Sequence, residues 1–422
     1  MNDLFRMSAV QADSTAPCAL HDQNRTQDPS ESRSRLSDTH RRWLLLVNSR
    51  GFGPVKLALA AEMIQKGLVL PGNAFQSCGQ ATALSPAECA RVRRCMTGSE
   101  VADTLTAETI EVVSSWLDSA ADHSLMTLLD HDYPPLLKQL KNPPPVLYLK
   151  GERDLLAFPQ IAIVGSRRAS RQGLHVAKAF AKELSAHGFI VTSGLALGID
   201  TAAHQGSADT RTIAVLGCGT DVFYPPANKP LQMAIAHNGL LVSEFLPGTQ
   251  PAPHHFPKRN RIIAGLCLGT LVVEAGVRSG SLHTALAALD LGREVMAIPG
   301  SIYSTESRGC HSLIKQGAAL VETARDIVQR LAGAFETYRV LHGLEHQPDW
   351  VETASAGSNS LTHEGMDQQV LNALSAPKDL DELVADTGLD VSELMQTLLS
   401  LELDDVVIQD GGRYQRTEFQ LK

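Results

Sequence analysis

The chain has 422 residues, of which 43% are hydrophobic and 20% charged, and its formal net charge is −9. This composition is typical of a globular protein with two or three domains, and it excludes a membrane-spanning helix, because no apolar run reaches about 18 residues. Seven cysteines without a C-x-x-C pair, and an N-terminus without an apolar leader, favour a reduced, cytoplasmic protein without a cysteine-based metal site.

The negative charge is distributed unevenly along the chain. Residues 161–330 hold 16 Lys and Arg against 11 Asp and Glu, a balance of +5, whereas residues 366–422 hold 4 against 12, a balance of −8. The middle of the chain is therefore locally basic, as a polyanionic ligand would require, and the acidic groups lie elsewhere.

The N-terminal part is predicted to be helical. Residues 1–37 are polar, show no hydrophobic period and are expected to form a disordered tail. Two apolar runs separated by Gly51-Phe52-Gly53-Pro54 predict a helical hairpin, and residues 81–130 continue as short helices, among them 107–118. Residues 38–130 are therefore expected to be a SAM or helix-hairpin-helix-like domain. The hairpin glycines could hold a duplex phosphate, but few cations flank them, which favours a plain helical corner.

Residues 131–332 have the pattern of a different fold class. Proline-rich connections lead to residues 146–151, which have the pattern of an edge strand. Short apolar strands and helices then alternate, which is typical of a doubly wound parallel α/β sheet, an extended Rossmann-like fold. The expected strands are 161–164, 189–192, 212–216, 240–242, 270–273 and 295–298. The expected helices are 172–187, 228–237, 261–268 and 282–291.

The C-terminal part is predicted to be a separate small domain. Residues 333–363 are rich in Gly, Ser, Thr, His and Glu and are expected to be a linker. Residues 364–422 then show three helical stretches and a hairpin, a winged-helix-like pattern. The helices are expected at 368–374, 380–385 and 391–401. The balance of −8 argues against the usual duplex-binding use of this fold.

Glycine-rich turns follow the predicted strands, at the edge of a parallel sheet where ligands bind. They are Gly165-Ser166-Arg167-Arg168, the stretch from Ser193 to Asp200, Gly217-Cys218-Gly219-Thr220, Ser279-Gly280-Ser281 and Pro299-Gly300-Ser301. Glycines let a phosphate approach the backbone closely, and the hydroxyl groups add hydrogen-bond donors. Several such turns on one sheet edge favour a polyanion groove over scattered structural glycines.

A basic stretch adds to this groove. A proline-broken loop leads into a helix whose first turn carries Lys258, Arg259 and Arg261. Cations are disfavoured at the positive end of a helix dipole, so we expect them to bind an anion there. Phe256 offers a ring on which a base could stack. Taken alone, so short a run would be interpreted as a solvated basic turn; with the glycine turns, it is expected to face Arg167 across the groove.

The sequence lacks the motifs of the other ligand and catalytic sites that occur on this class of sheet. Gly217-x-Gly219 has no third glycine and no G-x-x-x-x-G-K-[ST] occurs, so neither nucleotide-cofactor motif is present. Ser193, Asp200 and His204 lack the G-x-S-x-G elbow of hydrolases, and we interpret Asp200 and His204 as a helix N-cap and its surface partner. No histidine spacing supports a metal site. We therefore expect no cofactor, no metal and no catalytic residue.

Together these turns resemble a known family. The motifs occur in order as Ala162-Ile163-Val164-Gly165-Ser166-Arg167, Ser193-Gly194-Leu195-Ala196, Gly198-Ile199-Asp200-Thr201-Ala202-Ala203-His204, Val215-Leu216-Gly217-Cys218-Gly219, Tyr224-Pro225-Pro226, Ser243-Glu244, Phe256-Pro257-Lys258-Arg259-Asn260-Arg261-Ile262-Ile263, Val273-Glu274-Ala275, Ser279-Gly280-Ser281-Leu282 and Pro299-Gly300. This order is similar to that of the DNA-processing protein A family (DprA, also called Smf). The resemblance covers about residues 130–330 through many separate motifs, and the flanking parts agree by pattern alone.

The resemblance implies a non-catalytic homodimer that binds single-stranded DNA, helps to load the RecA recombinase and serves natural transformation, without a membrane partner. It assigns DNA binding to Gly165, Ser166, Arg167, Ser193, Gly194, Phe256, Lys258, Arg259, Asn260, Arg261, Gly280 and Ser281. Leu197 stands where the family usually has Lys or Arg, which removes a cation. His283 stands where an aliphatic residue is usual, and it is expected to add a pH-dependent contact.

Two other hypotheses belong to different functional classes. A lysine-decarboxylase-like enzyme that hydrolyses N-glycosidic bonds in nucleoside monophosphates would have the same sheet, but its P-G-G-x-G-T-x-x-E signature is missing from residues 274–280. A transcription factor led by the winged helix is opposed by the acidic balance there. The sequence also predicts that Arg167 and Arg259 lie at the sheet rim, where alanine substitution changes stability by about ±0.5 kcal/mol at most.

Overall fold

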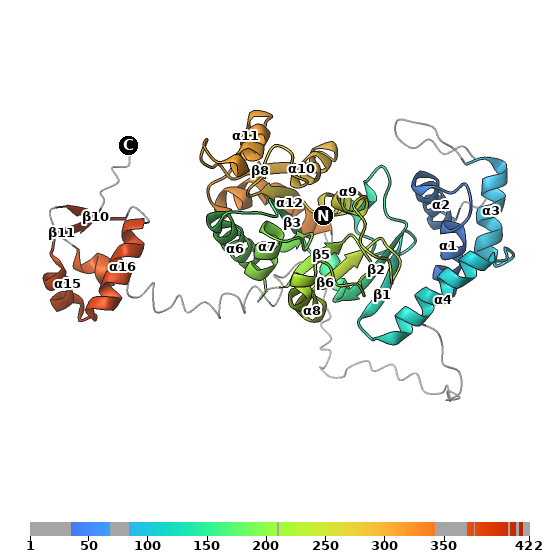
Figure 1. Ribbon diagram of the computed structural model, residues 1–422, viewed down its shortest axis with the longest axis horizontal. Coiled ribbons are helices and arrows are strands. Elements are labelled where there is room, and N and C mark those ends of the chain that lie inside the picture. Colours follow the sequence, from blue (N-terminus) through green and yellow to red (C-terminus); the bar gives the residue numbers. More distant parts are fainter. Residues whose placement is uncertain are drawn as a thin grey trace, which may run out of the picture.

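The computed structural model describes residues 35–67, 84–208, 211–341, 369–374, 376–403, 406–410 and 413–416. Most of the predicted tail and most of the predicted linker lie outside these ranges. The chain forms an N-terminal group of helices, a central α/β domain and a small C-terminal domain (Figure 1). In the ranges described, no helix is both long and apolar enough to cross a bilayer.

The predicted helical hairpin is present near the N-terminus. The helices there are α1 (Asp38–Val47), α2 (Pro54–Gln65), α3 (Pro86–Thr97) and α4 (Thr104–Ser119). The Ser37 hydroxyl accepts a hydrogen bond from the backbone of His40 and caps α1, and Pro54 starts α2 as expected. The predicted tail, residues 1–37, extends too far. Arg35 already belongs to the folded part of the chain, because its guanidinium donates hydrogen bonds to four backbone carbonyls at and beyond the end of α4.

The central sheet contains nine strands in the order β1-β2-β6-β5-β4-β3-β7-β8-β9. They are β1 (His123–Thr127), β2 (Val146–Gly151), β3 (Gln160–Val164), β4 (Ile190–Ser193), β5 (Thr212–Leu216), β6 (Leu240–Ser243), β7 (Gly269–Val272), β8 (Glu294–Ala297) and β9 (Ala319–Leu320). Strands β3 to β9 run parallel, which confirms the predicted α/β fold, and β2 and β1 are added antiparallel at one end.

Two sequence predictions about this end of the sheet are wrong. Residues 123–127 were expected to be part of the helical domain, but they form β1, which pairs with β2 from His123↔Lys150 to Thr127↔Val146. The strand 146–151 is therefore internal rather than at the edge. A short apolar run fits a helix and a strand equally well, and only the partner strand decides between them.

Helices cover both faces of the sheet. They are α5 (Pro135–Lys138), α6 (Arg171–Ala186), α7 (Ile199–Gly206), α8 (Lys229–Asn238), α9 (His255–Leu266), α10 (Ser281–Asp290), α11 (Arg308–Lys315) and α12 (Ala324–Leu341). Alternate residues of β3 separate the two cores: Ile161 and Ile163 pack with α6, α7 and α12, whereas Ala162 and Val164 belong to the core that contains α9, α10 and the N-terminal helices.

The helix α12 shows that the linker prediction starts too early. It continues to Leu341, and Phe335 packs on Phe189 with ring centroids 4.6 Å apart, while Tyr338 is buried. These contacts make residues 333–341 part of the α/β domain. Their polar composition hid the widely spaced apolar positions on one helix face.

The C-terminal domain has its own small core. Residues 369–373 are helical, and the other elements are α15 (Leu380–Thr387), α16 (Val391–Leu403), β10 (Val407–Asp410) and β11 (Arg413–Arg416). Val370, Leu383, Leu398 and Val407 are buried together, and β10 pairs antiparallel with β11. This arrangement is the predicted combination of helices and a hairpin.

Candidate nucleic-acid interface

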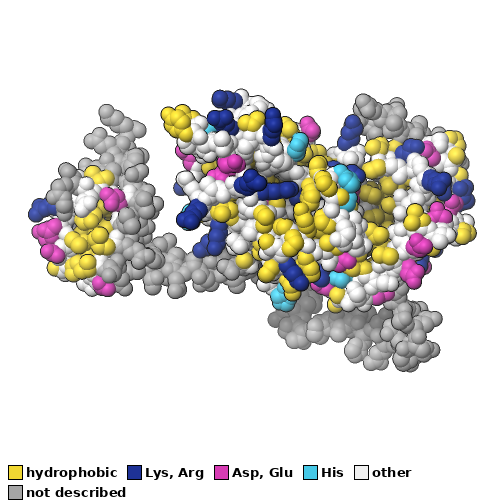
Figure 2. Space-filling model, in the orientation of Figure 1, with side chains coloured by type: hydrophobic (Ala, Val, Ile, Leu, Met, Phe, Trp, Pro, Cys, Tyr) yellow, Lys and Arg dark blue, Asp and Glu magenta, His cyan; other side chains and the backbone are white. Residues whose placement is uncertain are grey.

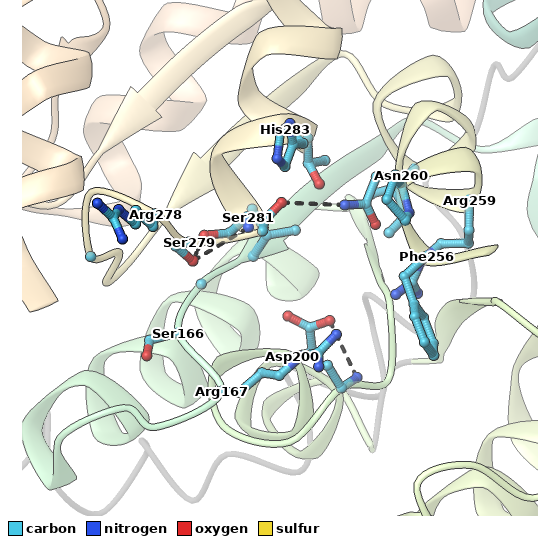
Figure 3. Close-up of a pocket in the computed structure, with 18 of the residues that line it drawn as sticks. Ser166, Arg167, Asp200, Phe256, Arg259, Asn260, Arg278, Ser279, Ser281 and His283 are labelled. Carbon is cyan, nitrogen blue, oxygen red and sulfur yellow. Dashed lines mark hydrogen bonds between the residues drawn. The ribbon is translucent and has the colours of Figure 1, made fainter. Parts of the chain in front are cut away.

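A cleft of about 780 Å³ opens at the carboxyl ends of β3 and β7. These strands are neighbours, but the chain leaves β3 towards one edge of the sheet and leaves β7 towards the other. In open α/β sheets such a switch point is the usual place for a ligand. The turn after β3, the first turns of α9 and the loop before α10 form the walls (Figure 3).

The turn after β3 is held in place by its neighbours. The backbone N–H of Ser166 donates to the carbonyl of Glu274 at 2.7 Å, and the carboxylate of Glu274 accepts hydrogen bonds from the N–H and hydroxyl of Ser170, the N-cap of α6. A Cβ on Gly165 would lie 2.5 Å from the Ile199 side chain, so only glycine fits there. The turn therefore presents Arg167 from a fixed backbone.

Phe256, on α9, forms an aromatic platform with Tyr224. The two rings are stacked, with centroids 5.6 Å apart and planes 30° apart. The Phe256 ring rests on Gly217, where an added Cβ would lie 2.9 Å from it, and the Arg167 guanidinium carbon lies 5.5 Å from its centroid. Tyr224 belonged to one of the family motifs but was not predicted as a site residue. Its ring makes the platform wider than one side chain.

Arg259 is not at the rim, which corrects a prediction from the sequence. The side chain is only 4% exposed; its guanidinium donates to the carbonyl of Val215 and lies against Gly194, where a Cβ would be 2.1 Å from a guanidinium nitrogen. Burial lowers the pKa of Arg259 to about 10, and nearby Asp200 opposes this shift. Arg259 therefore supports the cleft from beneath.

Asp200 and His204 are also placed differently from the prediction. Gly198, not Asp200, is the N-cap of α7, and the Asp200 carboxylate accepts the backbone N–H groups of Gly194 and Ala196 at 3.2 and 3.3 Å. Burial raises the pKa of Asp200, and Arg259 opposes this shift. His204 is fully buried, bonds to the Thr212 hydroxyl at 2.9 Å, and has its pKa lowered to about 3 by burial. Both residues are interior supports.

The loop before α10 forms the opposite wall. The Asn260 side-chain amide donates to the carbonyl of Gly280 at 3.3 Å and joins the loop to α9, as Figure 3 shows. The hydroxyls of Ser279 and Ser281 lie 2.7 Å apart. A Cβ on Gly280 would meet nothing within 4 Å, so the packing of this chain does not require glycine there. The loop is open to a ligand on the cleft side.

The cleft gathers eight of the twelve predicted site residues: Gly165, Ser166, Arg167, Phe256, Arg259, Asn260, Gly280 and Ser281. The other four predicted residues do not line the cleft. The hydroxyl of Ser193 is buried and donates to the carbonyl of Ile163, and Gly194 is covered by the packed guanidinium of Arg259. Lys258 is exposed on α9 away from the lining. Arg261 forms an ion pair with Glu244 and donates to the carbonyl of Asn142.

Two exposed cations that line the cleft were not among the site residues predicted from the sequence. These are Arg168 and Arg278. Arg168 is the last residue of one glycine turn that the sequence did identify, and Arg278 directly precedes another, so their position in the chain was the available signal. With Arg167 they make three exposed arginines in the lining of the cleft, which also includes the Phe256–Tyr224 platform. Figure 2 shows Lys and Arg side chains in the regions of α6 and α11 on the visible face of the α/β domain.

This arrangement suits a ligand that has both phosphates and flat rings. Exposed guanidinium groups neutralise phosphate oxygens and can form two hydrogen bonds at once. Aromatic rings stack on any base, because every base has a π-face. The cleft can therefore hold a nucleotide chain, with its phosphates at the exposed arginines and a base stacked on the Phe256–Tyr224 platform.

Comparison with known proteins gives the family. Residues 124–332 match the family described as DNA recombination-mediator protein A, and residues 354–413 match the DprA winged helix domain. The chain is 50% identical over 204 residues to DNA processing protein DprA of Streptococcus pneumoniae, which is 48% of this chain and 72% of that protein. It is 38% identical over 322 residues to protein Smf of Escherichia coli, which is 73% of this chain and 81% of that protein.

A solved structure agrees with these sequence matches. The X-ray structure of DNA processing protein A from Streptococcus pneumoniae is 36% identical, with a TM-score of 0.55, and the match covers 69% of this chain and 97% of that one. Sequence motifs, sheet topology and both matched domains therefore point the same way, and the chain belongs to the DNA recombination-mediator protein A family, known as DprA or Smf.

Proposed function

We propose that the protein binds single-stranded DNA in the cleft between β3 and β7 and acts, without catalysis, as a recombination mediator. The observation that carries this proposal is one cleft, at the switch point of the sheet, that is lined by the Phe256–Tyr224 platform and by three exposed arginines. Its finer parts follow the family resemblance: a homodimer that helps to load RecA onto DNA that enters the cell in natural transformation.

The platform favours a single strand over a duplex. A ring can stack only on a base whose face is free, and in a duplex both faces are covered by neighbouring bases. The lining of the cleft includes serine hydroxyls and arginines, which contact phosphates without reading sequence, and the amide of Asn260 already donates to Gly280. Binding is therefore expected to tolerate any base sequence.

The hypothesis of an N-glycosidic hydrolase has less support than that of a DNA-binding protein. It needs a free carboxylate in the stretch 274–280, yet Glu274 is used to hold Ser170 at the start of α6. The carboxylate of Asp200, which lines the cleft, accepts two backbone hydrogen bonds. The deciding assay titrates labelled oligo-dT, duplex DNA of the same length and AMP, with product detection for AMP. Tighter binding to duplex, or release of adenine, contradicts the proposal.

Salt dependence gives a first prediction. If Arg167, Arg168 and Arg278 each neutralise one phosphate, log K for oligo-dT should fall against log[salt] with a slope of about −2, at ~0.7 per contact on a single strand. Arg259 is excluded from this count because it is buried. Fluorescence anisotropy at several salt concentrations measures the slope, and a flat dependence contradicts a phosphate-binding cleft.

Truncation gives a second prediction. A chain that ends after Leu341 keeps all of α12 and is expected to fold and to bind oligo-dT as the full chain does, because the acidic C-terminal domain repels phosphates. A chain that ends at residue 332 is the comparison. It lacks Phe335 and Tyr338, leaves Phe189 uncovered and should be less stable. If the longer truncation folds yet loses most of its affinity, the C-terminal domain is a DNA site.

A further inference from the structure

A second hollow adjoins the cleft, between the helices α6 and α7. Its volume is about 410 Å³, and we call it the α6–α7 groove. Arg167 and Arg168 line both this groove and the cleft. The two hollows therefore meet at these arginines. A strand that extends from the cleft on this side would contact these two exposed cations at the border of the groove.

The charge of the groove suits a phosphate backbone. Besides the two arginines it is lined by Lys178 and His175 of α6, both exposed, and none of its lining residues is Asp or Glu. A hollow of about 600 Å³ beside α8 is different, because Asp122, Glu152 and Lys150 line it together. An anion is favoured in the first and not in the second.

The shape of the α6–α7 groove is set by close packing between the elements that form it. Helices α6 and α7 touch at Gly206, where a Cβ would lie 2.3 Å from the carbonyl oxygen of Lys178. The turn before α7 is locked onto the turn after β3, because Ile199 N–H donates to the carbonyl of Ser166 and Gly198 adopts a φ of +81° against it. Binding there needs no rearrangement of either helix.

Two of the polar side chains that line the groove, Asn228 and Thr201, are already hydrogen-bonded within the protein. The Asn228 amide donates to the carbonyl of Leu195 and to the Thr201 hydroxyl, and this hydroxyl donates to the carbonyl of Ala196. Leu197 is 45% exposed at the tip of this turn and offers an apolar surface to a sugar or a base face. The groove can hold a nucleotide by charge and apolar contact without reading its base.

We infer that the α6–α7 groove is a second subsite for the same single strand, holding the nucleotides next to those in the cleft. The inference rests on the proposed function of the cleft, and it adds the path of the strand and the longer DNA that the protein needs. Lys178 supplies the phosphate contact of this subsite, and Leu197 its apolar contact.

The test is a ladder of oligo-dT from about four to about sixteen nucleotides, the range over which single-strand sites of small domains differ. The wild-type protein should bind the long oligonucleotides more tightly than the short ones. Lys178→Ala should bind the shortest like the wild type, and for the longest its salt slope should become less steep by about 0.7. Lys178→Glu should weaken the longest on the order of tenfold, since it places like charges together.

The matched control is Lys182→Ala, which removes an exposed lysine of the same helix outside the groove. It should behave as the wild type at every length. A third variant is expected to gain affinity. Leu197→Arg adds a cation to the groove that Lys178 also lines, and it should steepen the slope of log K against log[salt] for long oligonucleotides by about 0.7. Equal behaviour of Lys178→Ala and Lys182→Ala at all lengths overturns the second subsite and leaves the cleft untouched. Absence of oligo-dT binding by the wild type overturns both.

Discussion

Replacement of Arg259 by alanine is expected to destabilise the protein by about 3–5 kcal/mol, the range found when a buried charge loses its partner. The guanidinium is almost fully buried and donates to the carbonyl of Val215, and it is the charge that most opposes the effect of burial on the pKa of Asp200. Its removal takes this favourable charge away from the buried Asp200 and leaves a cavity beside Gly194. Urea unfolding followed by circular dichroism measures the loss.

Two comparisons separate the charge of Arg259 from its volume. Arg259→Met keeps much of the volume and should also destabilise, whereas Arg259→Met combined with Asp200→Asn removes both buried charges and should recover a large part of the loss. Arg167→Ala, at an exposed position, should change the free energy of unfolding by no more than about 0.5 kcal/mol. If Arg259→Ala is as stable as Arg167→Ala, the supporting role of Arg259 is wrong.

Replacement of Phe256 by alanine is expected to weaken the binding of oligo-dT by on the order of 1–3 kcal/mol, the usual cost of losing one stacked base. The ring lies between Gly217, Tyr224 and Arg167, so its removal takes away half of the platform and the surface on which Arg167 rests. Titration of labelled oligo-dT by anisotropy measures the change, with unfolding curves run on the same samples.

The control for Phe256 keeps its apolar volume without a ring. Phe256→Leu should fill the space above Gly217, remain folded and still lose most of the affinity that Phe256→Ala loses. Phe256→Tyr, which keeps the ring, should bind nearly as the wild type. Wild-type affinity in Phe256→Leu would mean that Phe256 only packs the cleft wall and that no base stacks there.

The sequence by itself determined the fold class and indicated the edge of the sheet at which the cleft lies. The period of the strands and helices from Ile161 to Ile298 predicts a parallel sheet, and β5 begins and ends as predicted. Local patterns suffice for this because buried parallel strands are nearly continuous apolar runs bounded by turns. The glycine turns after β3 and before α10 marked the cleft, because backbone that approaches a ligand closely leaves a local signal in the residue type.

The tertiary structure alone decided which charged residues face the cleft. Lys258, Arg259 and Arg261 stand within four residues on one helix, yet the first is exposed, the second is buried beside Gly194 and the third is paired with Glu244. A helix turns by about 100° per residue, so neighbours in sequence point in different directions. What each one meets depends on strands and loops far away in the chain, such as Val215 for Arg259. Whether a cation binds DNA or supports the fold is therefore set by packing.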